Sequence, residues 1–301
     1  MKSTHALALL LAATTSATLW AATAASTEGS AAKAKAAEAP TCAKDKALCA
    51  SVAGEWRTPE AKARDQYRHP IESLTFWGLK PGMTVLEIQP GGGWWTDILA
   101  PYARMTGGKF YVTAADLSNP KLSDGSRKAR ADFEAKYSGK PELYGDVRYV
   151  NWGAVSKTLP ADTFDLVLTA RSIHNWMQES PNAVPGTFSE FYKALKHGGI
   201  LAVEQHRANP TGGAEKPETG YVSEAYVIDQ AQKAGFKLAA RSEINANPKD
   251  TKDHPFGVWT LPPALRSSPE NSDAAADPKF DHSKYLAIGE SDRMTLRFVK
   301  P

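Results

Sequence analysis

The sequence predicts an α/β protein with a mostly parallel, seven-stranded sheet covered by helices on both faces. Three observations support this fold class: short apolar runs of strand length, helical repeats of apolar residues between them, and glycine or proline turns at their boundaries. Short continuous apolar runs are typical of strands buried on both faces, as in parallel sheets. Strands that alternate with helices favour parallel pairing through helical crossovers.

Each strand is predicted from an apolar run next to turn-forming residues. The first run follows Pro81-Gly82 and the second follows Gly107-Gly108. The seven runs are residues 83–88, 109–116, 147–151, 164–170, 200–206, 236–243 and 293–300. Because ligands bind beyond the carboxyl ends of the strands in such sheets, we expect functional residues directly after them.

Helices are predicted from apolar residues at helical spacing. One helix should follow the glycine run and end at Pro101, since proline lacks the amide hydrogen that a helix needs. A second should cover residues 186–199, with Gly198 as its C-terminal stop. A third should begin at residue 223 and run to Gly235.

The beginning of the chain has the features of a secretory signal peptide, predicted for residues 1–25. Lys2 supplies a positive charge, residues 6–11 form an apolar segment, and Ala22 to Ala24 give an A-x-A cleavage site. No later segment offers ~20 consecutive apolar residues, so no membrane contact is expected after cleavage. We therefore expect the protein in the periplasm or outside the cell.

Residues 26–50 are predicted to be a linker that carries a cysteine pair. The segment is small, charged and of low complexity, and it cannot bury much apolar surface. Cys42 and Cys49 are the two cysteines of the chain, and in an exported protein they are expected to form a disulfide. Two free thiols are the alternative if the chain is not exported. Residues 51–301 then form one domain of ordinary size.

Composition argues against several partners. The formal net charge is only +3 and no dense Lys/Arg block occurs in the folded part, so no nucleic acid is expected. The histidines do not have HxxxH or HxH spacing, and the residues after the fourth and fifth strands are richer in histidine than in clustered carboxylates, so no metal is expected. The sequence does not indicate an oligomeric state.

The stretch "EIQPGGG", residues 87–93, follows the first predicted strand and is the most informative motif. Its glycines leave no side chain between the backbone and a ligand, and the next helix begins with unpaired amide hydrogens. This suits a nucleotide-like ligand. The third glycine of a dinucleotide motif is replaced by Thr96, and no G-K-[ST] follows, so nicotinamide and triphosphate sites are disfavoured.

Asp116 ends the second predicted strand. Its distance from the glycine run is that of a carboxylate that accepts hydrogen bonds from two ribose hydroxyl groups. The alternative is that Asp116 only caps the segment that follows it.

These motifs resemble the class I S-adenosylmethionine-dependent methyltransferases, which have a Rossmann-like sheet. The match uses Glu87, Ile88, Gly91 and Gly93, while Gln89 replaces the first glycine of the family pattern. The resemblance implies that the cofactor S-adenosylmethionine binds here. The residues that it places at the cofactor are Glu87, Gln89, Gly91, Gly93, Asp116, Asn151, Trp152 and Arg171, with Asn151 or Trp152 at the adenine.

A longer match is more specific. The segments "RDQYRHPIESLTFWGLKPGMTVLEIQPGGGWWTDILAPY", "NPKD" (247–250) and "DRMTLRFVKP" resemble a group of exported predicted methyltransferases of Gram-negative bacteria.

Candidate catalytic residues follow the fourth and fifth strands. His174 and His206 are the candidates for a general base, since an imidazole titrates near neutral pH. The alternative is that each histidine caps a strand or packs under a loop. The candidates for substrate contact are Arg64, Tyr67, His69 and Trp176, and Arg68 of the same segment could also touch cofactor or substrate. For the first three the alternative is ordinary helix-start chemistry.

The expected function is methyl transfer from S-adenosylmethionine to a small molecule. The alternative is a non-catalytic protein that uses the fold to bind another nucleoside or metabolite. Residues 261–285 are polar and long for a connection, which predicts a lid or, from composition, mostly disorder with Phe280 and Tyr285 as docking points.

Overall fold

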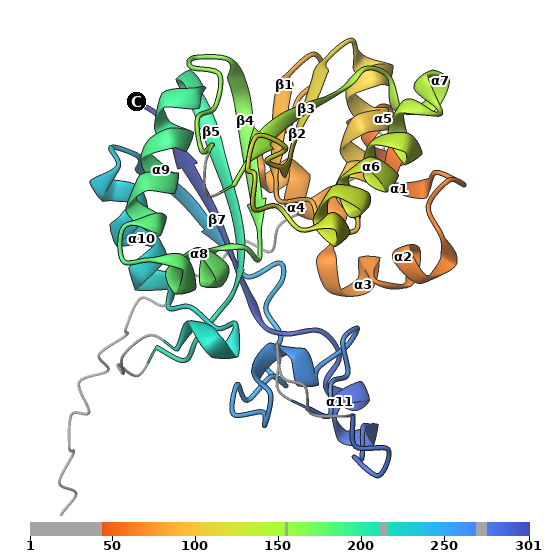
Figure 1. Cartoon of the computed structure of the whole chain (residues 1–301), viewed down its shortest axis with the longest axis vertical. Coiled ribbons are helices and arrows are strands. Elements are labelled where there is room, and N and C mark those ends of the chain that lie inside the picture. Colours follow the sequence, from red (N-terminus) through yellow and green to blue (C-terminus); the bar gives the residue numbers. More distant parts are fainter. Residues whose placement is uncertain (1–43, 154–155, 211–215, 269–275) are drawn as a thin grey trace, which may run out of the picture. The chain divides into compact units, whose positions relative to one another are not determined.

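Seven strands form one sheet, and each includes or overlaps one of the predicted runs. They are β1 (Thr84–Ile88), β2 (Lys109–Ala115), β3 (Val147–Trp152), β4 (Phe164–Ala170), β5 (Leu195–His206), β6 (Lys237–Ser242) and β7 (Arg293–Val299). Their order is β3-β2-β1-β4-β5-β7-β6, and only β7 is antiparallel to its neighbours (Figure 1). The mostly parallel α/β sheet predicted from the sequence is therefore confirmed.

The computed structural model describes residues 44–153, 156–210, 216–268 and 276–301. The predicted signal peptide and most of the predicted linker, including Cys42, lie outside these residues. Cys49 lies in the first described helix, and the disulfide between the two cysteines stays a prediction.

The described helices cover both faces of the sheet. They are α1 (Lys46–Ala53), α2 (Pro59–Ala63), α3 (Asp65–Arg68), α4 (Pro70–Trp77), α5 (Thr96–Thr106), α6 (Asp124–Ser138), α7 (Pro141–Tyr144), α8 (Ile173–Glu179), α9 (Ala183–Ala194), α10 (Glu224–Lys233) and α11 (Ser283–Ile288), with short 3-10 helices η1 (Pro217–Thr219) and η2 (Gly257–Thr260). Helices α8, α9 and α10 pack on one face, and α1, α4, α5 and α7 on the other (Figure 1). None of the described helices is long and apolar enough to cross a membrane.

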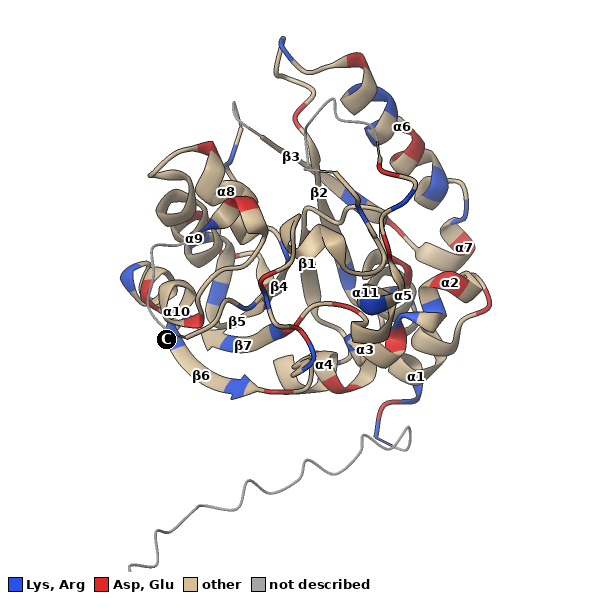
Figure 2. Ribbon diagram, turned by 90° about the horizontal axis from the view of Figure 1, so that it is seen from below, with Lys and Arg blue, Asp and Glu red and all other residues tan. Residues whose placement is uncertain are grey.

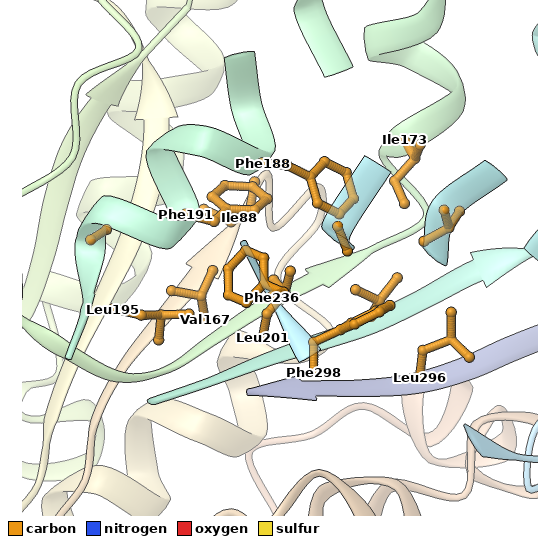
Figure 3. Packing of buried hydrophobic residues seen from close by; sticks show 14 of the residues in the cluster. Ile88, Val167, Ile173, Phe188, Phe191, Leu195, Leu201, Phe236, Leu296 and Phe298 are labelled. Atoms are coloured by element: carbon orange, nitrogen blue, oxygen red, sulfur yellow. The ribbon is translucent and has the colours of Figure 1, made fainter. Parts of the chain in front are cut away.

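The core on the α9 face is built from aromatic side chains that lie over alternate strand residues. Phe188 and Phe191 of α9 cover Val167 of β4, Leu201 of β5 and Phe298 of β7, all fully buried (Figure 3). Burial of one such side chain stabilises the fold by roughly 1.5–3 kcal/mol. This packing fixes the central strands, whose carboxyl ends carry the candidate site.

Helix α5 continues through Pro101 to Thr106, so the prediction that it ends at Pro101 was wrong. Proline cannot donate a backbone hydrogen bond to the carbonyl of Asp97, four residues earlier. That carbonyl instead accepts a bond from the Trp56 indole nitrogen at 2.7 Å. Because the indole supplies the hydrogen bond that proline cannot, the helix can continue past Pro101.

Helix α9 ends at Ala194, before the predicted stop at Gly198. Leu195 is already extended, with ψ 142°, and pairs with Phe164 as the first residue of β5. Gly198 has φ +76° in the irregular part of β5, and its amide donates to the carbonyl of Lys300. Strand pairing to β4 therefore overrides the helical pattern of the sequence.

Residues 243–292 connect β6 to β7 at the carboxyl edge of the sheet. The side-chain amide of Asn247, in the "NPKD" stretch, donates to the carbonyls of Ile288 and Glu290 at 2.9 and 2.7 Å. Within this connection Phe280 stacks on Tyr285, with ring centroids 5.5 Å apart. The predicted docking points thus pack on each other, and residues 261–268 and 276–285 have defined turns where disorder was expected.

Candidate functional site

A cavity of about 990 Å³ lies where β1, β2, β3 and β4 end. Its lining includes the last residues of β2, β3 and β4, residues that follow β1 and β4, one face of α6, and residues of the α2–α3 segment. Pro263, from the long connection before β7, also lines it. The position at the carboxyl edge of the sheet is the one that the sequence predicted.

The glycine run has two roles. Gly91 and Gly92 line the cavity, and a Cβ atom added to either would meet no atom within 4 Å. Gly93 does not line it: a Cβ there would lie 2.0 Å from the hydroxyl of the buried Tyr137. Gly91 is therefore placed to approach a ligand, whereas Gly93 lets the loop pack against α6.

Gln89 occupies a backbone conformation that normally favours glycine, with φ +48°. Its backbone amide donates a hydrogen bond to Thr113 Oγ1 at 2.7 Å, and its side-chain Oε1 accepts one from Trp176 Nε1 at 2.8 Å. A non-glycine residue in this region costs on the order of 1 kcal/mol. These two bonds hold it there, and they explain why this chain tolerates glutamine at the family's first glycine.

Trp176 is fully buried and does not line the cavity. Its predicted contact with substrate is replaced in the structure by the bond to Gln89, so its influence on the site passes through that residue.

Glu87 lies behind the glycine loop and does not line the cavity. Its Oε2 accepts a hydrogen bond from Thr96 Oγ1 at 2.6 Å, and the residue is only 3% exposed. Burial raises the pKa of Glu87 to about 8, so the carboxyl is mostly protonated at neutral pH. In the structure it joins β1 to the start of α5.

The two carboxylate oxygens of Asp116 differ in their partners. Oδ1 accepts bonds from the amide and the hydroxyl of Ser118, at 2.9 and 2.6 Å, which caps the turn after β2. Oδ2 is buried and has no hydrogen-bond partner among the described residues. The hydrogen bond from the Ser118 hydroxyl is the main reason why the pKa of Asp116 is lowered. Residues 113–115 of β2, which precede Asp116, line the cavity, whereas the buried Asp116 lies directly behind this lining.

The end of β3 presents Trp152 to the cavity. Trp152 lines it and stacks on Phe191, with ring centroids 6.0 Å apart and planes 21° apart. Asn151 does not line it, because its side-chain oxygen accepts a hydrogen bond from Arg130. Of the two adenine candidates, only Trp152 faces the cavity.

Arg64, Arg68 and Arg171, all of them predicted, line the cavity. Arg64 Nε lies 2.5 Å and Arg68 Nε 3.1 Å from the carboxylate of Glu290. The surrounding guanidinium groups hold the pKa of Glu290 well below its usual range, although burial opposes this. Arg171 has φ +59° and lies 3.8 Å from Glu204.

His174 and His206 do not line the cavity. His174 Nδ1 lies 3.1 Å from the Gln205 amide nitrogen, and His206 Nδ1 lies 2.5 Å from Ser291 Oγ. Burial lowers the pKa of His174 to about 4 and that of His206 well below its usual value, so both rings are neutral at pH 7. Their catalytic role stays a prediction, and the geometry fits the alternative, packing below the strand ends.

Tyr67 and His69 also lie away from the cavity lining. His69 Nδ1 is 3.2 Å from Asn245 Oδ1, and a Cβ on Gly289 would lie 2.6 Å from the Tyr67 ring. Both side chains pack against residues 243–292, the segment that joins β6 to β7. Of the four candidates for substrate contact, only Arg64 therefore lines the cavity.

Helix α6 is the largest part of the site that the sequence analysis missed. One face of it lines the cavity at intervals of three or four residues: Ser126, Ala129, Arg130, Phe133 and Lys136. The helix is highly charged and buries only Tyr137, so apolar periodicity is weak. The N-cap at Ser123, whose hydroxyl accepts from the amide of Ser126, was the available signal.

The described residues contain no group of three or more His, Cys, Asp or Glu that could hold a metal ion.

Residues 86–203 match the family model of a methyltransferase domain. The matched residues run from β1 to β5, and the strand order 3-2-1-4-5-7-6 with helices on both faces is the Rossmann-like fold of methyltransferase domains, whose cofactor is S-adenosylmethionine.

Several known proteins are similar to this chain. The ubiquinone/menaquinone biosynthesis C-methyltransferase UbiE of Marinomonas sp. (strain MWYL1) is 28% identical over 185 residues, 61% of each chain. UbiE of Vibrio vulnificus (strain YJ016) is 32% identical over 126 residues, 42% of each chain. A solved S-adenosylmethionine-dependent methyltransferase from Aquifex aeolicus aligns with a TM-score of 0.45 and 21% identity, covering 64% of this chain and 90% of that one. The chain thus spans less than two thirds of the length of these two UbiE relatives.

Proposed function

We propose that this protein transfers a methyl group from S-adenosylmethionine to a small molecule. The observation that carries the proposal is the cavity beside the glycine loop, where Gly91 and Gly92 leave open space at the end of β1. A volume of about 990 Å³ is at the upper end of the range of small-molecule sites, which leaves room for a cofactor and an acceptor.

The residues present fit the cofactor at two points. The unpartnered Oδ2 of Asp116 can accept a hydrogen bond from a ribose hydroxyl group while Oδ1 keeps its cap. Trp152 offers an aromatic surface after β3 for the adenine. The backbone at Gly91 and Gly92 allows close approach of the amino-acid end.

When bound, the cofactor supplies an activated methyl group on a positively charged sulfur. The protein then has to hold the acceptor in line with that methyl group and to exclude water, and positioning of this kind supplies much of the rate enhancement. The α2–α3 segment, α6 and Pro263 border the cavity and provide that enclosure. Among the residues that the structure describes, no imidazole lines the cavity, so we do not assign a general base to a histidine.

We also propose that the chain is exported and works in the periplasm or outside the cell, with a disulfide between Cys42 and Cys49. The signal-like first 25 residues and the long match to exported predicted methyltransferases support this. Cell fractionation with thiol labelling under denaturing conditions tests it: a cytoplasmic protein with two reactive thiols would contradict it.

Isothermal titration of the purified chain with S-adenosylmethionine and S-adenosylhomocysteine tests the proposed function. We expect a dissociation constant on the order of 1 μM, about −8 kcal/mol. NADH is the control ligand and should not bind. Absence of binding to both sulfur nucleosides would overturn the proposal, and binding without turnover on any acceptor would favour the non-catalytic alternative.

A further inference from the structure

The wall of the cavity formed by Arg64, Arg68 and Arg171 has more positive than negative charge. Behind it, Arg293 and the carboxylates of Glu204 and Glu290 complete a buried group, the arginine cluster. Four guanidinium groups face two carboxylates, an excess of two positive charges. On helix α6, by contrast, Lys and Arg lie among Asp and Glu (Figure 2).

Among the nearby acidic residues, Glu60 also lines the cavity but is exposed to solvent, and Glu87 and Asp97 have other partners. The carboxyl of Glu87 has its pKa raised to about 8 by burial and bonds to Thr96. Asp97 pairs with Lys136 at 2.8 Å and accepts a hydrogen bond from Tyr137. Burial and the charge of Arg171 lower the pKa of Arg68, as expected for cations that are incompletely neutralised.

Two guanidinium nitrogens of the cluster make no hydrogen bond to any residue that the structure describes, and one of them, Nη1 of Arg171, lies 3.8 Å from Glu204 Oε1. Nη1 of Arg68 and Nη1 of Arg171 are both buried and make no hydrogen bond among the described residues, although both side chains line the cavity. Arg68 is only 2% exposed, and its guanidinium lies over the Trp94 ring at 4.7 Å from the centroid. Unsatisfied donors on a fixed cation are costly unless an oxygen ligand reaches them.

The cofactor alone does not balance this charge. Its carboxylate is matched by its own ammonium group, and its sulfur adds a further positive charge. The carboxylate of the cofactor could pair with one of the two guanidinium groups. The cofactor as a whole would still add one positive charge, so the excess of positive charge in the cavity would grow. A second anionic group is therefore needed.

We propose that the methyl acceptor is a small acidic molecule, whose carboxylate or phosphate group is bound by Arg68 and Arg171. This inference rests on the proposed function, because it assigns the acceptor side of the same cavity. Guanidinium groups bind such oxyanions through two parallel hydrogen bonds, which also orient the molecule.

Titration of the full chain with inorganic sulfate and phosphate at constant ionic strength tests this subsite. The titration is done with and without saturating S-adenosylhomocysteine, on the wild type, Arg68→Gln, Arg171→Gln and the control Arg241→Gln. Arg241 lies on β6, is 58% exposed and pairs with Glu224, away from the cavity. We expect both anions to bind with and without the nucleoside, and each cavity variant to weaken them about tenfold or more.

Anion affinity that is unchanged in both cavity variants, or equally reduced in Arg241→Gln, would overturn the proposal. Competition between the anions and S-adenosylhomocysteine would also overturn it, since the arginines would then hold the cofactor carboxylate. If the nucleoside does not bind but both arginines still bind sulfate, the proposed function fails and the anion subsite stands. Circular dichroism of each variant checks that it is folded.

Discussion

The Gln89 side chain accepts a hydrogen bond from the indole of Trp176 at 2.8 Å, and this bond joins the glycine loop to the core under α9. Gln89 is in the left-handed backbone region and at the edge of the cavity, whereas Trp176 is fully buried. A departure from the family's glycine pattern is thus stabilised by a residue 87 positions later in the chain.

Gln89→Leu should destabilise the protein by about 1–3 kcal/mol, because it leaves a buried indole N–H without an acceptor. Gln89→Gly should cost less, since glycine relieves the strain at φ +48°. Denaturant unfolding of both variants measures this. In a Trp176→Phe background the donor is absent, so Gln89→Leu should destabilise the protein less than it does in the wild type. An equal loss of stability in both backgrounds would contradict the role of the bond.

Gly92→Ala and Gly93→Ala should separate binding from stability. Gly93→Ala places a methyl group against the Tyr137 hydroxyl and should cost about 2–4 kcal/mol by overpacking and backbone strain. Gly92→Ala meets no protein atom, so stability should change by less than about 1 kcal/mol while S-adenosylhomocysteine binds more weakly. Thermal unfolding and titration of the two variants measure the effects; a reversed order would show that the loop is misassigned.

His174 should make the protein less stable in acid. Its pKa is about 4 in the folded state and near 6.5 when unfolded, so the unfolded chain binds the proton more readily. Stability should therefore fall as pH falls from about 6.5 to about 4, with His174 contributing up to about 3 kcal/mol. Unfolding curves across this range should show a smaller loss in His174→Gln than in the wild type. Equal pH dependence in both would contradict the buried, neutral imidazole.

The same variant tests the predicted base. His174→Gln should retain S-adenosylhomocysteine affinity, since the ring does not line the cavity. Once an acceptor is identified, a loss of turnover with unchanged binding would instead support the catalytic role predicted from the sequence.

Trp56→Phe should destabilise α5 by about 1–2 kcal/mol, because the carbonyl of Asp97 loses its donor. Pro101→Ala restores a backbone N–H at the helical position, so the cost of Trp56→Phe should be smaller in that background. A double-mutant cycle by denaturant unfolding measures the coupling. Additive costs would show that the indole does not replace the missing helical bond.

Strands were predictable from the sequence because burial on both faces leaves an apolar run, as in "FDLVLTA", which is β4 without change of boundary. Helix ends were less predictable, because long-range contacts decide them. Trp56 lies 41 residues before the carbonyl that lets α5 continue, and Leu195 leaves the helix to pair with Phe164. Neither contact has a local sequence signal.

The site was predictable in location but not in detail. A cavity lies at the glycine run and the strand ends, where the site was expected, and Arg64, Arg171 and Trp152 line it. His174 looked equally suitable, but whether a side chain after a strand points to the cavity or into the core depends on tertiary packing. Helix α6 was missed because a solvated, charged helix carries little apolar periodicity.

The central claim, that the cavity holds S-adenosylmethionine with Asp116 at the ribose, is tested most directly by titrating S-adenosylhomocysteine into the wild type and Asp116→Asn. Asparagine keeps an oxygen for the cap with Ser118 but lacks the negative charge, so affinity should fall about 10-fold to 100-fold while the fold is retained. Ser118→Ala, which removes only a cap bond, should bind nearly as the wild type. Micromolar binding to the wild type that weakens only in Asp116→Asn is the result we expect; equal affinity in all three proteins, or no binding to the wild type, would contradict the claim.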